Sequence, residues 1–253
     1  MINRQIKLLN LWRLTLIMSS LLLAGIPDRA AAAIGPYGGV TYALAVDPND
    51  PNVLYAGMNF GGVFKSFDGG QTWYDANNGI PSYYADRNVP DLAVDPGDSS
   101  TVYACLDGSG VFKSTDGGET WSARNQGLAG LRVQTVVVNP NHSNVVYVGT
   151  TDGGIFKSRD GGETWSAINE GLKALRLDPR SIVIHPKDSN VLYAGVFGGG
   201  VYKSRDGGQR WEAVNNGLKD RRVKNLAMDP RDPDVLYAGT ADGIFKTIDG
   251  GRR

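Results

Sequence analysis

Arginine, tyrosine and aspartate side chains recur in the variable segments of this 253-residue chain, in types that could bind an anion or cleave a glycosidic bond. Guanidinium groups bind carboxylates and phosphates through paired hydrogen bonds. Two facing carboxyl groups supply the acid and the base of glycoside hydrolysis. The candidate ligand-binding residues are Arg87, Arg132, Arg176, Arg180, Arg221, Arg222, Tyr83, Tyr84, Asp107, Asp152 and Asp242.

The candidate arginines and tyrosines lie between the units of an internal repeat, and the candidate aspartates lie in a loop within each unit. The phrase "STDGGETW" (114–121) returns with small changes at 66–73, 158–165, 204–211 and, incompletely, at 247–253. The aspartates of successive copies are 48, 44, 46 and 43 residues apart. A catalytic motif is normally needed once, so five copies indicate architecture.

Each repeat contains four short apolar runs, as in "YALAVDPND", "NVLYAG", "GVFKS" and a last run that begins at the tryptophan. Val, Ile, Tyr, Phe and Trp punctuated by Pro, Asp and Gly are typical of strands and turns. Repeats of about 40–50 residues with four strands each predict a β-propeller. We therefore expect an all-β fold of four-stranded antiparallel blades that bury one another. A parallel β-helix is the alternative, but its repeats would be shorter.

The recurring phrase has a structural explanation within this fold. Its Asp can accept backbone N–H bonds across a turn, and its glycine pair permits positive φ angles. The Ser hydroxyl adds a local hydrogen bond, and the Trp can wedge between sheets. We expect each copy to join the third strand of a blade to the fourth, through Asp68, Asp116, Asp160, Asp206 and Asp249 and through Trp73, Trp121, Trp165 and Trp211.

The pattern S-x-D-G-G-x-T-W in four-stranded repeats resembles the Asp-box, or bacterial neuraminidase repeat (BNR), propellers over residues 40–253. That superfamily includes sialidases, xyloglucan-cleaving glycoside hydrolases, sortilin-type receptors and photosystem II assembly factors. The resemblance implies the fold and leaves the function open, because enzymes and binding proteins share this architecture.

Two enzyme classes within the resemblance fit the sequence incompletely. A sialidase needs an arginine triad, a Tyr–Glu pair and an Asp, and an Arg-Ile-Pro stretch before the first box. Here "GIP" (79–81) follows the first box and lacks the Arg. The xyloglucan-cleaving enzymes place two acidic residues on opposite sides of a cleft between two propellers. The repeats of this sequence predict one propeller. Asp107 and Asp152 each precede Gly, a pairing common in turns.

The loops are the expected place for function. In a four-stranded meander the loops between blades (4–1) and the 2–3 loops share one face, and the Asp boxes lie on the other. The 4–1 loops, residues 77–91, 125–134, 169–181 and 215–225, carry the candidate arginines. We therefore predict a non-catalytic binding or assembly propeller that binds a protein or an anionic glycan there. A glycoside hydrolase and a purely structural extracellular module are the alternatives.

Residues 1–33 predict a secretory signal peptide, with a basic start, the apolar run 14–26 and an Ala-rich end. Thirteen apolar residues are too few to cross the ~30 Å hydrocarbon core comfortably, although an uncleaved anchor is the alternative. The expected propeller is residues 34–253, in a periplasmic, lumenal or extracellular location without a stable membrane span after cleavage. Removing the segment leaves 22 basic and 25 acidic residues, which gives no attraction to nucleic acid.

The composition predicts neither a cofactor nor a metal site. There is no P-loop, zinc-finger spacing or G-x-S-x-G elbow, and both histidines, His142 and His185, fall in turns after a first strand. Cys105 is the single cysteine, which excludes an intramolecular disulfide, and its place at a strand end predicts a packing role.

The fifth repeat stops where its Trp and fourth strand would begin, which leaves 19 expected strands for five blades. We expect either a C-terminally truncated larger propeller, which we favour, or imperfect closure with five blades. An open edge would also favour edge pairing or oligomerisation.

Overall fold

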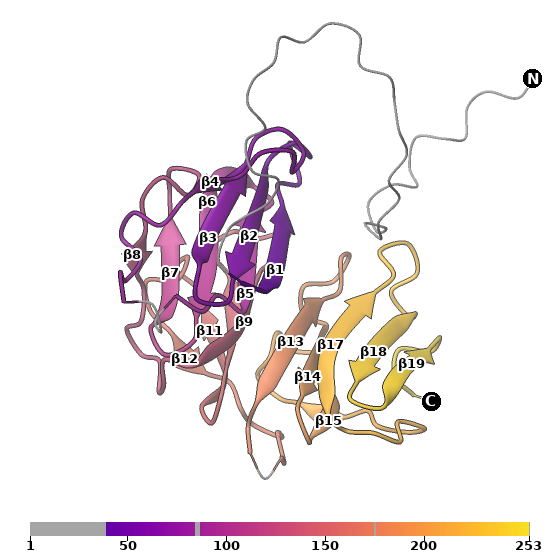
Figure 1. Ribbon diagram of the computed structural model, residues 1–253. Coiled ribbons are helices and arrows are strands. Elements are labelled where there is room, and N and C mark those ends of the chain that lie inside the picture. The colour runs from indigo at the N-terminus through magenta and orange to yellow at the C-terminus, as the bar shows by residue number, and fades with distance from the viewer. Residues whose placement is uncertain (1–38, 84–86, 175, 253) are drawn as a thin grey trace, which may run out of the picture. The chain divides into compact units, whose positions relative to one another are not determined.

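The computed structural model describes residues 39–83, 87–174 and 176–252, and Figure 1 labels their strands. The predicted signal peptide and Tyr84 lie outside these residues. The described residues form nineteen β-strands in five antiparallel sheets, which confirms the predicted all-β propeller of four-stranded blades. In this part of the chain the fifth sheet has three strands.

The strands of each sheet follow one another in sequence order. Blade 1 consists of β1 (Thr41–Val46), β2 (Leu54–Met58), β3 (Gly62–Ser66) and β4 (Tyr74–Asp75). Blade 2 consists of β5 (Asp91–Asp95), β6 (Asp98–Leu106), β7 (Gly110–Ser114) and β8 (Ser122–Ala123). Blade 3 consists of β9 (Val133–Val138), β10 (Val146–Thr150), β11 (Gly154–Ser158) and β12 (Ser166–Ala167). Blade 4 consists of β13 (Pro179–Ile184), β14 (Leu192–Val196), β15 (Gly200–Ser204) and β16 (Glu212–Ala213). Blade 5 consists of β17 (Val223–Met228), β18 (Leu236–Thr240) and β19 (Gly243–Thr247).

The second strands of blades 2, 3 and 4 carry the most continuous apolar sequence because neighbouring blades cover both of their faces. All five residues of β10 and of β14 are buried. The first strands of consecutive blades contact one another, from β1 through β5, β9 and β13 to β17. The fourth strands are only two residues long, so the turn before each of them must fix its position.

The Asp box is that turn, and its bonds match the prediction. In blade 3, Asp160 accepts hydrogen bonds from the Ser158 hydroxyl at 2.7 Å, the Thr164 amide at 2.9 Å and the Thr164 hydroxyl at 2.6 Å. These bonds lower the pKa of Asp160 to about 2, and the bond from the Thr164 hydroxyl contributes most. Gly161 and Gly162 have φ angles of 70° and 92°, which side chains rarely tolerate.

The box also joins one blade to the blade before it, through the Trp that was expected to wedge between sheets and through two bonds that the sequence analysis did not foresee. The Trp165 indole lies buried between blades 2 and 3 and donates from Nε1 to the Arg124 carbonyl at 2.8 Å. The Tyr103 hydroxyl and the Lys113 ammonium of blade 2 both donate to the Gly161 carbonyl, at 2.9 and 2.8 Å. The box is therefore the joint between blades as well as a turn within one.

The same joint recurs at the other blade boundaries. A Tyr of the second strand and a Lys of the third strand donate to the first box glycine of the following blade at Gly117, Gly207 and Gly250. The sequence signal was present, since each of the first four repeats has this Tyr and Lys ten residues apart. Their spatial relation to the next blade was not visible in it.

The two terminal blades lack one neighbour each among the described residues, and the exposure of their side chains reflects this. Leu44 on β1 is 52% exposed, whereas its counterpart Leu92 on β5 is 6% exposed. Ile244 on β19 is 80% exposed, whereas Val63 on β3 is fully buried. The apolar pattern is therefore the same in every repeat, and only the presence of a neighbour decides what is buried.

Replacing the buried indole of blade 3 should destabilise the fold strongly. We expect Trp165→Ala to lower the free energy of unfolding by about 3–5 kcal/mol, the usual cost of removing a buried aromatic ring. Trp73→Ala is the matched control, because the Trp73 side chain is half-buried and bonds only to Gly70 of its own box. Its cost should be less than half as large in urea denaturation, and equal costs would contradict the joint between blades.

Candidate functional site

The 4–1 and 2–3 loops lie together, and we call the surface they build the mouth face. Each 4–1 loop lies on the 2–3 loop of the blade that precedes it. The amides of Gly108, Asp152 and Gly198 donate to the carbonyls of Leu131, Leu177 and Arg221, at 3.0, 2.7 and 2.9 Å. The Asp boxes instead bond to the 1–2 loops, as Gly161 does to Asn144, which supports the predicted separation of the two faces.

Two of the candidate arginines form ion pairs with candidate aspartates across these loops. Arg132 lies 3.1 Å from Asp107 through Nε, and the two residues also form an antiparallel bridge. Arg176 binds Asp152 with both ends of its guanidinium, at 2.6 and 3.2 Å. Both guanidinium groups remain more than half exposed. The sequence analysis selected these four residues one by one, and the structure shows that they form two pairs.

Two further candidates pair with aspartates that the sequence analysis did not single out. Arg180 bonds to Asp178 at 2.9 Å, and Arg222 bonds to Asp220 at 2.9 Å. Both carboxylates are buried and both arginines are partly exposed. Hydrogen bonds from Arg222 lower the pKa of Asp220 to about 2. The sequence signal was the D-x-R spacing inside each loop.

The Arg180 guanidinium also lies over the ring of Phe197, with Cζ 4.6 Å from the ring centroid. Such stacking fixes the plane of the guanidinium and adds a cation–π attraction. Phe197 is on the 2–3 loop of blade 4 and forms an antiparallel bridge with Arg222. The region between blades 3, 4 and 5 is therefore the most densely connected part of the mouth face.

The remaining candidates are more separate. Arg87 is half-buried and donates from Nε to the Pro81 carbonyl at 2.9 Å. Arg221 is exposed and Tyr83 is 69% exposed. Asp242 is exposed with its amide bonded to Thr240, and it lies beside the Arg222–Asp220 pair, because its backbone also bonds to Asp220. Arg87, Arg221 and Tyr83 do not join the ion-paired set.

The Arg–Asp pairs of the mouth face are better suited to binding a ligand than to acid–base catalysis. Each paired arginine keeps N–H donors that its aspartate does not use, since a guanidinium has five. The carboxylates, in contrast, already accept hydrogen bonds from those arginines. In the described part of the chain no three or more His, Cys, Asp or Glu side chains are grouped as a metal site would require.

One carboxyl group outside the mouth loops has a pKa suited to proton transfer. Burial raises the pKa of Asp91, at the start of β5, to about 6. Its oxygens accept hydrogen bonds from the Thr135 hydroxyl at 2.8 Å, the Val136 amide at 2.9 Å and the Leu92 amide. The sequence analysis did not single out Asp91. The available signal was that the other four repeats have an uncharged residue at this position, Ala43, Thr135, Ser181 and Asn225. Its bonds connect blade 2 to blade 3, which gives it a structural role.

Family and structure comparisons agree on the fold. The Sortilin-Vps10 family model (sortilin, neurotensin receptor 3) matches residues 109–196. An ancestral GH74 enzyme aligns at 24% identity and a TM-score of 0.65 over 82% of this chain and 28% of its own. The extracellular domain of a hybrid two component system from B. thetaiotaomicron aligns at 15% identity and a TM-score of 0.63, over 82% and 28%.

The GH74 xyloglucanase from Xanthomonas campestris aligns at 18% identity and a TM-score of 0.54, over 87% of this chain and 47% of its own. The chain thus spans less than half the length of each of these structures. A comparison with curated protein sequences gave no match. No helix among the described residues is long and apolar enough to cross a bilayer.

The repeated boxes, the four-stranded sheets and these likenesses define the class of protein, an Asp-box β-propeller, and confirm the resemblance found in the sequence. Identities below 25% establish the fold alone. The activities of the longer proteins are therefore not transferred by the likeness.

The raised pKa of Asp91 predicts how stability changes between pH 4 and 6. An unfolded Asp loses its proton near pH 3.9, whereas folded Asp91 keeps it to about pH 6, so stability falls as pH rises through this window. We expect the melting temperature of the unmodified protein to fall between pH 4.5 and 7, and Asp91→Asn to remove most of that fall. Equal pH profiles for the two proteins would contradict this assignment.

Proposed function

We propose that this protein is an exported, non-catalytic binding or assembly propeller whose mouth face binds a protein or an anionic glycan. The observation that carries the proposal is the set of Arg–Asp pairs on this face. Arg132, Arg176 and Arg222 are each held by an aspartate while more than half of the guanidinium side chain stays exposed. Side chains fixed before binding lose little conformational entropy on contact with a ligand.

The aspartate partners also set the charge of the proposed site. Paired guanidiniums attract a diffuse polyanion less than free ones, because each positive charge is compensated locally. They suit a ligand whose carboxylate, sulfate or phosphate groups reach the remaining N–H donors in defined directions. The exposed side chain of Tyr83 offers an aromatic surface nearby in sequence to Arg87, of the kind that sugars and peptides contact.

A glycoside hydrolase is the alternative function, favoured by the likeness to enzymes described as GH74. It would need two carboxyl groups free to exchange protons across a substrate. Asp107 and Asp152 belong to different blades, and each is already bonded to an arginine. Neither carboxylate is therefore free to face a substrate without giving up its arginine, so we favour binding. A purely structural module is the remaining alternative.

Export rests on the sequence of residues 1–33 and receives support from one structural neighbour, which is described as an extracellular domain. The single cysteine is buried and free, so the fold uses no disulfide in this environment.

Reversing charge on the mouth face should weaken anion binding. We expect the double substitution Arg132→Glu and Arg222→Glu to weaken binding of heparin and of polygalacturonate oligosaccharides at least tenfold, measured by isothermal titration at 100 mM salt. The control is Arg159→Glu with Arg205→Glu, two exposed arginines of the blade 3 and blade 4 Asp boxes on the opposite face. If both double variants lose affinity equally, the effect is one of net charge and the mouth face is not the site.

The hydrolase alternative predicts turnover of a suitable glycoside. We expect none with xyloglucan or a fluorogenic sialoside, with circular dichroism of the same sample confirming that the protein is folded. Turnover that disappears in Asp107→Asn or Asp152→Asn, but not in a control such as Glu119→Gln in the blade 2 Asp box, would contradict the binding proposal.

A further inference from the structure

Two aromatic side chains, Phe67 and Tyr74, lie exposed at the outer edge of blade 1, and we call them the rim pair. Phe67 is in the Asp box directly after β3, and Tyr74 is on the outer strand β4. Each side chain is 56% exposed. The ring centroids are 6.0 Å apart, and the ring planes are inclined by 56°. Adjacent exposed rings of this size are a candidate interaction site.

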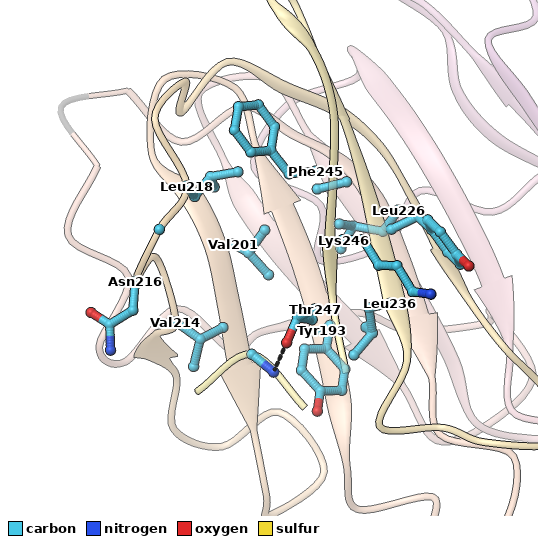
Figure 2. A pocket seen from close by; sticks show the side chains of 14 residues that line it. Tyr193, Val201, Val214, Asn216, Leu218, Leu226, Leu236, Phe245, Lys246 and Thr247 are labelled. Carbon is cyan, nitrogen blue, oxygen red and sulfur yellow. Dashed lines mark hydrogen bonds between the residues drawn. The ribbon is translucent and has the colours of Figure 1, made fainter. Parts of the chain in front are cut away.

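The open apolar surface beside β19 has a different origin, because it belongs to the packing of blades. Tyr193, Val201 and Val214 line an apolar cavity of about 140 Å³ between blades 4 and 5 (Figure 2). Between blades 3 and 4 the equivalent side chains pack around the indole of Trp211. This cavity is therefore a packing position of the repeat and not evidence of a ligand site.

The exposure of the rim pair does not depend on a missing neighbour. Lys65 is the direct partner of Tyr74 in the β3–β4 ladder, and its ammonium lies over the Phe67 ring. Directly opposite residues of an antiparallel pair point to the same face. The Lys65 ammonium also donates to the Gly117 carbonyl of blade 2 at 2.7 Å. The rim pair therefore lies on the face of blade 1 that is turned to blade 2, with blade 2 in place.

The same two positions are exposed in blades 2, 3 and 4, each of which has a blade on either side. They are occupied by Thr115 with Ser122, Arg159 with Ser166, and Arg205 with Glu212. Arg205 and Glu212 form an ion pair, so the two positions face each other in blade 4 as the two rings do in blade 1. Blade 1 thus has two aromatic rings at positions where these other blades have polar side chains.

The Lys65 ammonium already occupies the place that a cation would take on the rim pair. Its Nζ lies 4.5 Å from the Phe67 centroid and 5.3 Å from the Tyr55 centroid. Carboxylates of both blades, Asp47 and Asp116 among them, act on this ammonium. The face of an aromatic ring attracts cations and polarised C–H groups and repels anions. Lys65 would repel a second cation, so a neutral ligand rich in C–H groups fits the rim pair.

The hydrogen-bonding groups beside the two rings are mainly donors. An ammonium has three N–H donors, and that of Lys65 uses one on blade 2. The Tyr74 hydroxyl forms no hydrogen bond with a described residue and can donate as well. The Asp68 carboxylate of the same box already accepts three hydrogen bonds, two of them from Thr72. A ligand that offers C–H groups and carbonyl acceptors, and brings few donors of its own, matches this arrangement.

We propose that the rim pair binds a proline-rich segment of a partner polypeptide in the polyproline II conformation. Proline has no N–H donor, and a polyproline II helix leaves its carbonyl groups without internal hydrogen bonds. The prolyl rings present C–H groups to Phe67 and Tyr74, and the carbonyls accept from Lys65 and from the Tyr74 hydroxyl. Aromatic-lined grooves recognise such segments because this helix is formed before binding and loses little entropy.

The partner is a different polypeptide and not a second copy of this chain. The sequence has 12 prolines, none of them adjacent to another. The closest pairs, Pro48 with Pro51 and Pro230 with Pro233, lie in the turns between first and second strands. A second copy therefore offers no extended proline-rich segment. The rim pair lies at an Asp box, away from the mouth face, and does not rest on the function proposed there.

The test uses the full chain and a labelled decaproline peptide, with binding measured by fluorescence anisotropy. We expect saturable binding that changes less than twofold between 100 and 500 mM salt, because salt screens charges and this ligand has none on its side chains. A labelled Gly-Ser peptide of the same length is flexible and has no prolyl rings. It should bind at least tenfold more weakly.

Phe67→Thr combined with Tyr74→Ser tests the site on the protein. Blade 2 has Thr and Ser exposed at these two positions, so the repeat already accepts them. We expect this double variant to bind decaproline at least tenfold more weakly, with an unchanged circular dichroism spectrum. Tyr42→Ser is the matched control, since Tyr42 is 51% exposed on β1 of the same blade and lies outside the rim pair. It should bind as the unmodified protein does.

Four results would overturn the proposal. One is no binding of decaproline by folded protein, and binding of cellohexaose that is lost in the double variant would then assign the rim pair to a glycan. Another is equal binding of the proline and Gly-Ser peptides. A third is equal affinity of the double variant and the Tyr42→Ser control. The last is a steep loss of affinity with salt, which would point to a charged surface such as the mouth face.

Discussion

The structure depends on one contact, the burial of a box tryptophan against the blade that precedes it. At each of three blade boundaries the indole is shielded from water, and its N–H donates to the carbonyl of the residue that follows the preceding blade's fourth strand, at Ala76, Arg124 and Ile168. A two-residue fourth strand has too few ladder bonds to hold itself. The tryptophan, and the asparagine four residues later, supply the contacts that hold the fourth strand in place. The fold of one blade and its contact with the preceding blade therefore depend on each other.

The loops of the mouth face are held in place by this contact between blades. A 4–1 loop starts beside the tryptophan of the next blade and ends at that blade's first strand, so both of its ends are fixed. The loop then bonds along the 2–3 loop of the preceding blade, which brings Arg132 to Asp107 and Arg176 to Asp152. Charged side chains that are far apart in sequence become preorganised because the blades cannot shift independently.

The outer faces of blades 1 and 5 show what happens to the same side chains when no blade is packed against them. Tyr237 repeats the tyrosine that is buried in the first four blades, yet it is 39% exposed, and Leu44 repeats a buried leucine with the same result. Nothing in the local sequence distinguishes these residues from their buried counterparts. Surfaces of this kind are complementary to a blade, and among the described residues the outer faces of blades 1 and 5 have none packed against them.

Local periodicity and turn chemistry were enough to predict the fold class, the strand content of each repeat and the role of the Asp box as a turn. They also placed the candidate arginines on shared loops. Three facts came from the contacts between blades: Tyr103 and Lys113 reach the following box, Arg132 and Arg176 are paired, and the raised pKa belongs to Asp91. Those facts depend on which residues of neighbouring blades meet, and a single chain's pattern describes each blade but not the contact between two.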